Sequence, residues 1–126
     1  MLKSAAIIFG LFFIVAGIGG FVSALAPDGM LFGIFMVGPV HNTIHIASGV
    51  AALLCAFAGA GAARKYFQIF GVVYLLVALL GFVYGNQPLM GMVEHNKADI
   101  GLHIAIAVVA LFLGFMGNRD VSTTTG

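Results

Sequence analysis

The chain has 126 residues, of which 62% are hydrophobic and only 7% are charged, and its net charge is +1. Soluble globular domains carry about 25% charged residues, and disordered chains combine low hydrophobicity with high net charge, so both classes are excluded. The small net charge gives no basic surface for a nucleic acid, and a single cysteine, Cys55, cannot form an internal disulfide framework. The sequence therefore indicates an integral membrane protein whose first partner is the lipid bilayer.

Four segments are apolar enough to cross a membrane as helices, since a hydrocarbon core of about 30 Å requires about 20 residues. They form a single transmembrane domain, at about residues 5–26, 41–61, 66–85 and 99–117. The first is longer than the apolar part of a signal peptide, and Pro27 follows it directly, which argues against cleavage. We expect Arg64 and Lys65 to separate the second and third spans, and residues 118–126 to form a flexible tail. The prediction is an all-α, integral membrane four-helix bundle.

The basic residues predict the orientation of the chain in the membrane. Four of the five fall on one side of a four-span arrangement: Lys3, Arg64, Lys65 and Arg119. Lys97 alone falls on the other side. Because lysine and arginine accumulate in cytoplasmic segments, we expect both termini in the cytoplasm and the two longer loops, residues 27–40 and 86–98, on the outer side.

An internal similarity suggests a duplicated helical hairpin. Residues 10–21 match residues 71–82, and residues 41–46 match residues 95–100. Both copies would enter the membrane in the same sense. The sequence therefore predicts two parallel helical-hairpin repeats, related by an axis along the membrane normal.

Polar side chains are rare and costly within a membrane span, and here they gather on the second and fourth spans. His41 and His45 lie four residues apart, and His95, Asp99 and His103 repeat that spacing. Residues at i and i+4 share a helix face, and on both helices this face is otherwise made of small residues, which mark close helix contact in membranes. We therefore expect the second and fourth helices to face one another, with His45, Asp99 and His103 converging. His41 and His95 would lie at the outer mouth of this cluster.

One interpretation of the cluster is structural. Asn42 and Asn96 each stand where a helix is expected to start, and asparagine is a favoured N-cap. Asp99 follows Asn96 at the acidic position of a capping box. A buried contact of Asp99 with His45 or His103 would then hold two helices together. On this interpretation the protein is a structural or accessory membrane protein, either a homo-oligomer or a subunit of a larger membrane complex.

The same residues could instead bind a cofactor. Neutral imidazole is a ligand for Zn, Cu, Fe or Ni, and a carboxylate can complete the shell. The inner ligands of such a metal ion would be His45, Asp99 and His103. His41 and His95 would be outer members. Alternatively, His45 and His103 could be the axial ligands of a b-type haem.

A third interpretation is proton or small-solute passage in an oligomer, because histidine titrates near neutral pH. None of these interpretations needs a catalytic residue. The sequence also carries no Ser-His-Asp order, phosphate loop or dinucleotide fingerprint. We therefore do not expect an enzyme.

Three motifs carry a family resemblance. Residues 39–49 read Pro-Val-His-Asn-Thr-Ile-His-Ile-Ala-Ser-Gly, Gly71-Val-Val-Tyr74 precedes Gly81-Phe82, and residues 96–103 read Asn-Lys-Ala-Asp-Ile-Gly-Leu-His. With these motifs the chain resembles the bacterial four-span membrane proteins described as domain of unknown function 4383. The resemblance implies a four-helix membrane bundle in a bacterial plasma membrane, and it implies no activity.

Overall fold

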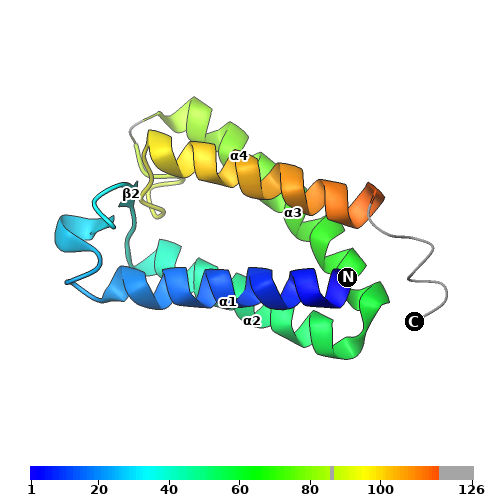
Figure 1. The fold of residues 1–126 in the computed structure, drawn as a ribbon. Helices are drawn as coiled ribbons and strands as arrows, with labels where there is room; N and C mark the ends of the chain where they lie inside the picture. The colour runs from blue at the N-terminus through cyan, green and yellow to red at the C-terminus, as the bar shows by residue number, and fades with distance from the viewer. Residues whose placement is uncertain (86, 117–126) are drawn as a thin grey trace.

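The computed structural model describes residues 1–85 and 87–116, and four helices form most of this part of the chain (Figure 1). They are α1 (Leu2–Phe21), α2 (Pro39–Ala58), α3 (Ala60–Tyr84) and α4 (Lys97–Leu111), which continues as a short π-helix, η2 (Phe112–Met116). Each of the four helices is long and apolar enough to cross a membrane when α4 is counted together with η2. This confirms the all-α, integral membrane four-helix class. The segment between α1 and α2 holds the short elements η1 (Pro27–Gly29), β1 (Met30–Leu31) and β2 (Phe35–Met36).

The helices pack as two hairpins, α1 with α2 and α3 with α4. Figure 1 shows these hairpins as two layers, with α3 leading from one layer to the other. The N-terminus and the turn between α2 and α3 lie at one end of the molecule, on the right of Figure 1, which we call the terminal end. The segment with β1 and β2 and the segment between α3 and α4 lie together at the other end, which we call the loop end.

Glycines let α1 and α2 approach closely. A Cβ atom on Gly10 would lie 2.9 Å from the carbonyl oxygen of Gly49, and one on Gly17 would lie 2.7 Å from that of Asn42. Gly20 packs directly on the Asn42 side chain. Such small residues stabilise helix pairs in membranes through van der Waals contact, because lipid tails are as apolar as the side chains that would be buried.

The α3–α4 hairpin uses glycine in the same way. Gly71 packs against Leu111, Gly81 against Ile100, and Gly114 against the backbone of Gln68. Gly71 and Gly81 are the residues that match Gly10 and Gly20 in the predicted duplication. The duplication itself stays a prediction from the sequence.

The third helix begins earlier than expected. Arg64 and Lys65 lie inside α3, so the predicted break at this pair is wrong. The chain turns instead at Gly59, whose φ of 131° is readily adopted only by glycine. Arg64 is accommodated within the helix because its Nη1 donates a hydrogen bond to the carbonyl oxygen of Gly114 at 3.2 Å.

The other helix ends also differ from the predicted spans. α1 ends at Phe21 rather than at residue 26, because the chain turns into η1 and the β1–β2 hairpin. α2 begins at Pro39, since the fixed φ of proline suits the first helical position. α4 begins at Lys97, directly after its N-cap. The predicted end of the last span at residue 117 and the tail at 118–126 lie outside the described residues.

Two similar tight turns close the loop end. Phe32 and Gly33 have φ values of 56° and 71°, and Met90 and Gly91 have φ values of 50° and 71°. The amide of Ile34 donates to the carbonyl oxygen of Leu31 across the first turn, and Met92 donates to Leu89 across the second. Two successive residues with positive φ are typical of the type I′ turns that close β-hairpins.

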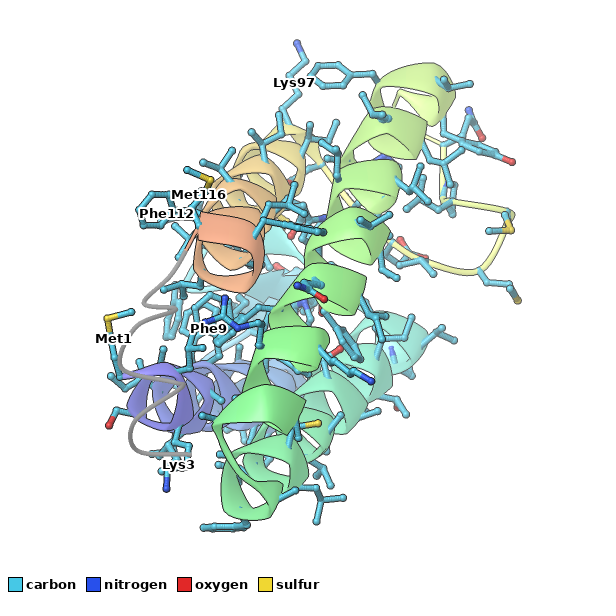
Figure 2. All side chains as sticks on the ribbon, turned by 90° about the vertical axis from the view of Figure 1, so that its right-hand side faces the viewer. Met1, Lys3, Phe9, Lys97, Phe112 and Met116 are labelled. Carbon is cyan, nitrogen blue, oxygen red and sulfur yellow. The ribbon has the colours of Figure 1, made fainter. Side chains whose placement is uncertain are left out.

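The side chains separate a buried core from an apolar outer face (Figure 2). Phe9 lies between the two hairpins, where its ring is in edge contact with Phe67 at a centroid distance of 5.0 Å. Phe112 and Met116 instead point outward from the fourth span and are 60% and 71% exposed. Large exposed apolar side chains of this kind occur on all four helices, as expected of a surface in contact with lipid.

Candidate metal centre

Three buried imidazoles meet near the loop end of the bundle. His41 and His45 come from successive turns of α2, and His103 comes from the inner face of α4. Each offers a ring nitrogen, and the three nitrogens all lie within 4.8 Å of one another. The ring centroids are 4.4 Å apart for His41 and His45, 5.6 Å for His41 and His103, and 6.3 Å for His45 and His103. We call these residues the three-histidine cluster.

The hydrogen bond of His41 fixes which of its nitrogens is free. Its Nδ1 lies 2.7 Å from the carbonyl oxygen of Glu94. Since a carbonyl oxygen only accepts, Nδ1 must carry the proton and donate, and the lone pair of the neutral ring is then on Nε2. Histidines that bind metals are commonly oriented by such a bond from the second ring nitrogen.

Several nitrogens of the cluster have no hydrogen-bond partner. Within residues 1–85 and 87–116, His41 Nε2, both ring nitrogens of His45, and His103 Nε2 are buried and unpartnered. A buried polar group normally finds a partner, and leaving one unpaired costs about 1–3 kcal/mol. These nitrogens therefore have lone pairs or protons that the described protein groups do not use.

Asp99 does not join the cluster, contrary to the expected inner set. Its Oδ2 accepts a hydrogen bond from the backbone amide of Asn96 at 2.9 Å, and its own amide donates to Asn96 Oδ1 at 3.0 Å. This reciprocal pair is a capping box at the start of α4, as the structural interpretation predicted for Asn96. Asp99 instead lines, together with His45, a separate cavity of about 220 Å³.

Asn42 is not an N-cap, so that expectation is wrong. The N-cap of α2 is Gly38, and Asn42 lies one turn inside the helix because Pro39 starts it earlier. The Asn42 side chain is 2% exposed and packs on Gly20 of α1. It therefore belongs to the contact between the helices of the first hairpin.

His95 is also buried, but it is not one of the three residues whose ring nitrogens lie within 4.8 Å of one another. It precedes α4, and its Cδ2 would be 3.8 Å from a Cβ atom on Gly81. Both of its ring nitrogens are buried and unpartnered among the described residues. Of the two residues expected at the mouth, His41 is thus an inner member and His95 is not.

The expected facing of the second and fourth helices holds only at the loop end. Close helix packing occurs within the two hairpins, and α2 and α4 approach through the rings of His41, His45 and His103. The cluster therefore links the two hairpins to each other.

Sequence reasoning did not place α3 beside the cluster. Tyr74 of α3 has its ring 5.5 Å from that of His103, and its hydroxyl donates to Ser48 Oγ at 2.9 Å. Tyr66, two turns away, donates to the carbonyl oxygen of Ser48 at 3.1 Å. The sequence signal that could have placed α3 there is Tyr74, near the middle of an apolar span, because a buried tyrosine hydroxyl needs a hydrogen-bond partner.

A second cavity, also of about 220 Å³, borders all three histidines. It lies between α2, α3 and the turn at residues 89–93, and its walls are almost wholly apolar. A group bound between the imidazoles would therefore border this space.

These features define a small four-span α-helical membrane protein with a buried histidine cluster that joins its two hairpins. The family described as Domain of unknown function (DUF4383) matches residues 3–116, and the chain belongs to this family. This confirms the resemblance seen in the sequence motifs. No curated protein and no solved structure matches the chain.

Proposed function

We propose that this protein binds one transition-metal ion within the membrane, through His41, His45 and His103. The observation that carries the proposal is the convergence of three buried imidazoles: one ring nitrogen of each lies within 4.8 Å of the others, and each ring has a buried nitrogen without a hydrogen-bond partner among the described residues. Neutral imidazole suits Zn, Cu, Fe and Ni. A tetrahedral ion at about 2.0–2.1 Å from each nitrogen would hold the three nitrogens about 3.3 Å from one another, inside the 4.8 Å that bounds their separations here.

The metal interpretation accounts for more of the site than the purely structural one. Helix capping explains the hydrogen bonds of Asn96 and Asp99, but it leaves the cluster nitrogens unpaired. An ion would use the lone pairs of all three rings at once. It would also connect α2 to α4, so the ion would stabilise the fold without taking part in a catalytic step.

The arrangement favours an ion over a haem. A macrocycle held between His45 and His103 would have to fill the space between their rings. The ring of His41 lies 4.4 Å from one and 5.6 Å from the other, so it occupies the edge of that space. A single ion instead makes use of all three residues.

We further propose that the protein resides in a bacterial plasma membrane with its termini in the cytoplasm. The support is the distribution of basic residues, which would put the loop end and the metal centre on the outer side. A cysteine introduced at Gly33 should then react with a membrane-impermeant maleimide added to intact cells. Labelling only after the cells are permeabilised would contradict this orientation. We also propose that the protein forms a homo-oligomer or is a subunit of a larger membrane complex.

The test of the metal site is the metal content of protein purified in detergent without a histidine tag, measured by plasma mass spectrometry. We expect about one ion per chain in the unmodified protein and in His95→Ala, which removes a buried histidine outside the cluster. We expect little metal in the His45→Ala/His103→Ala variant. Asp99→Asn should retain the ion, because Asp99 serves the capping box.

Two results would overturn the proposal. One is an unmodified protein that binds no transition metal when it is supplied in excess. The other is equal metal content in the double variant and the unmodified protein, with both shown to be folded by circular dichroism and gel filtration.

A further inference from the structure

The cavity beside the cluster has two chemically different walls. One wall is made by the imidazoles of His41, His45 and His103. The others are apolar apart from Ser48 and Tyr74, whose hydroxyls are bonded to each other. A ligand in this cavity would therefore meet ring nitrogens on one side and hydrocarbon on the rest.

The cavity borders the lipid-facing surface between α2 and α3. Ile44 of α2 and Val73 of α3 both line it, and each is 43% exposed. α2 and α3 are also packed less closely than the two helices within either hairpin. An apolar molecule in the bilayer would therefore meet the cavity along the line between α2 and α3.

We infer that an ion held by the three histidines takes its fourth ligand from this cavity, and that this ligand is a small, uncharged, mainly apolar molecule with one nitrogen or sulfur donor atom. The inference rests on the proposed metal site. Three protein ligands leave one position of a tetrahedral ion to an outside group. The walls of the cavity then select what that group can be.

Size and charge set the class of ligand. An apolar cavity of about 150 Å³ in another protein holds benzene, so about 220 Å³ accepts a molecule of that size but not one twice as large. A carboxylate or phosphate could bind the ion through one oxygen, but its other oxygens would lose their hydration against a wall whose described residues include no lysine or arginine, and burying unpaired polar atoms is costly.

The test uses the protein loaded with Co²⁺, whose visible absorption reports the ligands of the ion. Pyridine, which has the size of benzene, should change this spectrum in a saturable way. Acetate, which is charged, and para-phenylpyridine, which is too long, should bind at least about tenfold more weakly, a difference of about 1.4 kcal/mol. Equal binding of acetate would overturn the proposed ligand class, and equal binding of para-phenylpyridine would overturn the assignment to this cavity.

Two variants on α3 test the cavity directly. Val77→Phe and Leu80→Phe each place a larger side chain in the wall of the cavity and leave the three histidines unchanged. Each should retain one Co²⁺ per chain and bind pyridine at least about tenfold more weakly. Val83→Phe is the matched control, because Val83 is on the same helix but is 80% exposed, and its pyridine affinity should be unchanged.

The outcomes separate this inference from the proposed function. If the unmodified protein takes up no Co²⁺, the metal site itself fails. If Co²⁺ is bound but pyridine leaves the spectrum unchanged, the metal site stands and the inference fails. The size and charge series uses the unmodified protein, so it decides the matter even if a phenylalanine variant does not fold.

Discussion

Asp99 and His103 lie one turn apart on the same helix but have different roles. Asp99 is at the third position after its N-cap, where its carboxylate reaches back to the amide of Asn96. His103 is beyond that reach, so its ring points to the centre of the bundle and meets His41. The first polar turn of α4 thus stabilises the helix start, and the second supplies His103, one member of the cluster.

The capping role predicts a stability difference between two variants of Asn96. Asn96→Ala removes the side-chain acceptor for the Asp99 amide and should lower the free energy of unfolding by about 1 kcal/mol. Asn96→Ser keeps an acceptor for this amide and should be more stable than Asn96→Ala by about the same amount. Both lose the bond from Asn96 Nδ2 to the carbonyl oxygen of Ile34, so their difference isolates the cap. Denaturant titration in micelles, followed by circular dichroism, measures it, and equal stabilities would rule out the cap.

For individual residues, the sequence predicted the members of the site better than the contacts that each of them makes. The i, i+4 spacing placed His45 and His103 on inner faces, and both are in the cluster. His41 was expected at the mouth but is an inner member of the cluster. Its ring is oriented by the backbone oxygen of Glu94, which is distant along the chain, so nothing in the sequence indicates this bond. Asp99 was expected among the inner ligands but lies in the capping box. Its local hydrogen bonds to Asn96 are favoured over a contact with the histidines of the cluster.

The helices are specified by two kinds of small residue that a sequence does not distinguish. Some glycines fill a contact where no side chain fits, as Gly17 does against the backbone of Asn42. Others simply face open space, as Gly101 does on α4. The distinction requires the packing of the neighbouring helix.

This distinction predicts opposite effects of the same substitution. Gly17→Ala forces a Cβ to within 2.7 Å of the Asn42 oxygen, and we expect it to destabilise the protein by about 1–3 kcal/mol. Gly101→Ala meets nothing within 4 Å and should stabilise it by about 0.5–1 kcal/mol, because alanine loses less backbone freedom in a helix. Thermal unfolding of both variants in one detergent tests the pair. A stabilised Gly17→Ala would contradict the α1–α2 contact.

Four spans were predictable because length and hydropathy suffice for a helix in a membrane. Their ends were harder to place. The charges of Arg64 and Lys65 indicated a loop, but Arg64 reaches the carbonyl oxygen of Gly114 from within α3. The real break depends on Gly59, one of many glycines in the sequence, and only its φ separates it from the rest.

In the whole molecule, the three-histidine cluster lies where the two hairpins contact each other. Each hairpin is held by its own glycine contacts, while the histidines connect α2 to α4. An ion bound there would favour the docked arrangement over any state in which the hairpins separate. Metal binding and stability should therefore be linked.

This linkage predicts a metal-dependent unfolding temperature. Zn²⁺ at about a hundred times its Kd should stabilise the folded state by about 2.7 kcal/mol, and a chelator should reverse the effect. The stabilisation should also be lost in acid, since protonated imidazole has no free lone pair for the ion. Differential scanning fluorimetry with His45→Ala/His103→Ala as control checks this. An equal shift in the control would place the binding elsewhere.

X-ray absorption spectroscopy of the Zn²⁺-loaded protein shows whether three imidazoles hold one ion. We expect about three nitrogen ligands at about 2.0–2.1 Å, with the outer scattering of imidazole rings, and we expect loss of that scattering in His45→Ala/His103→Ala. A shell of oxygen ligands without imidazole scattering, or an unchanged spectrum in the double variant, would contradict the three-histidine centre.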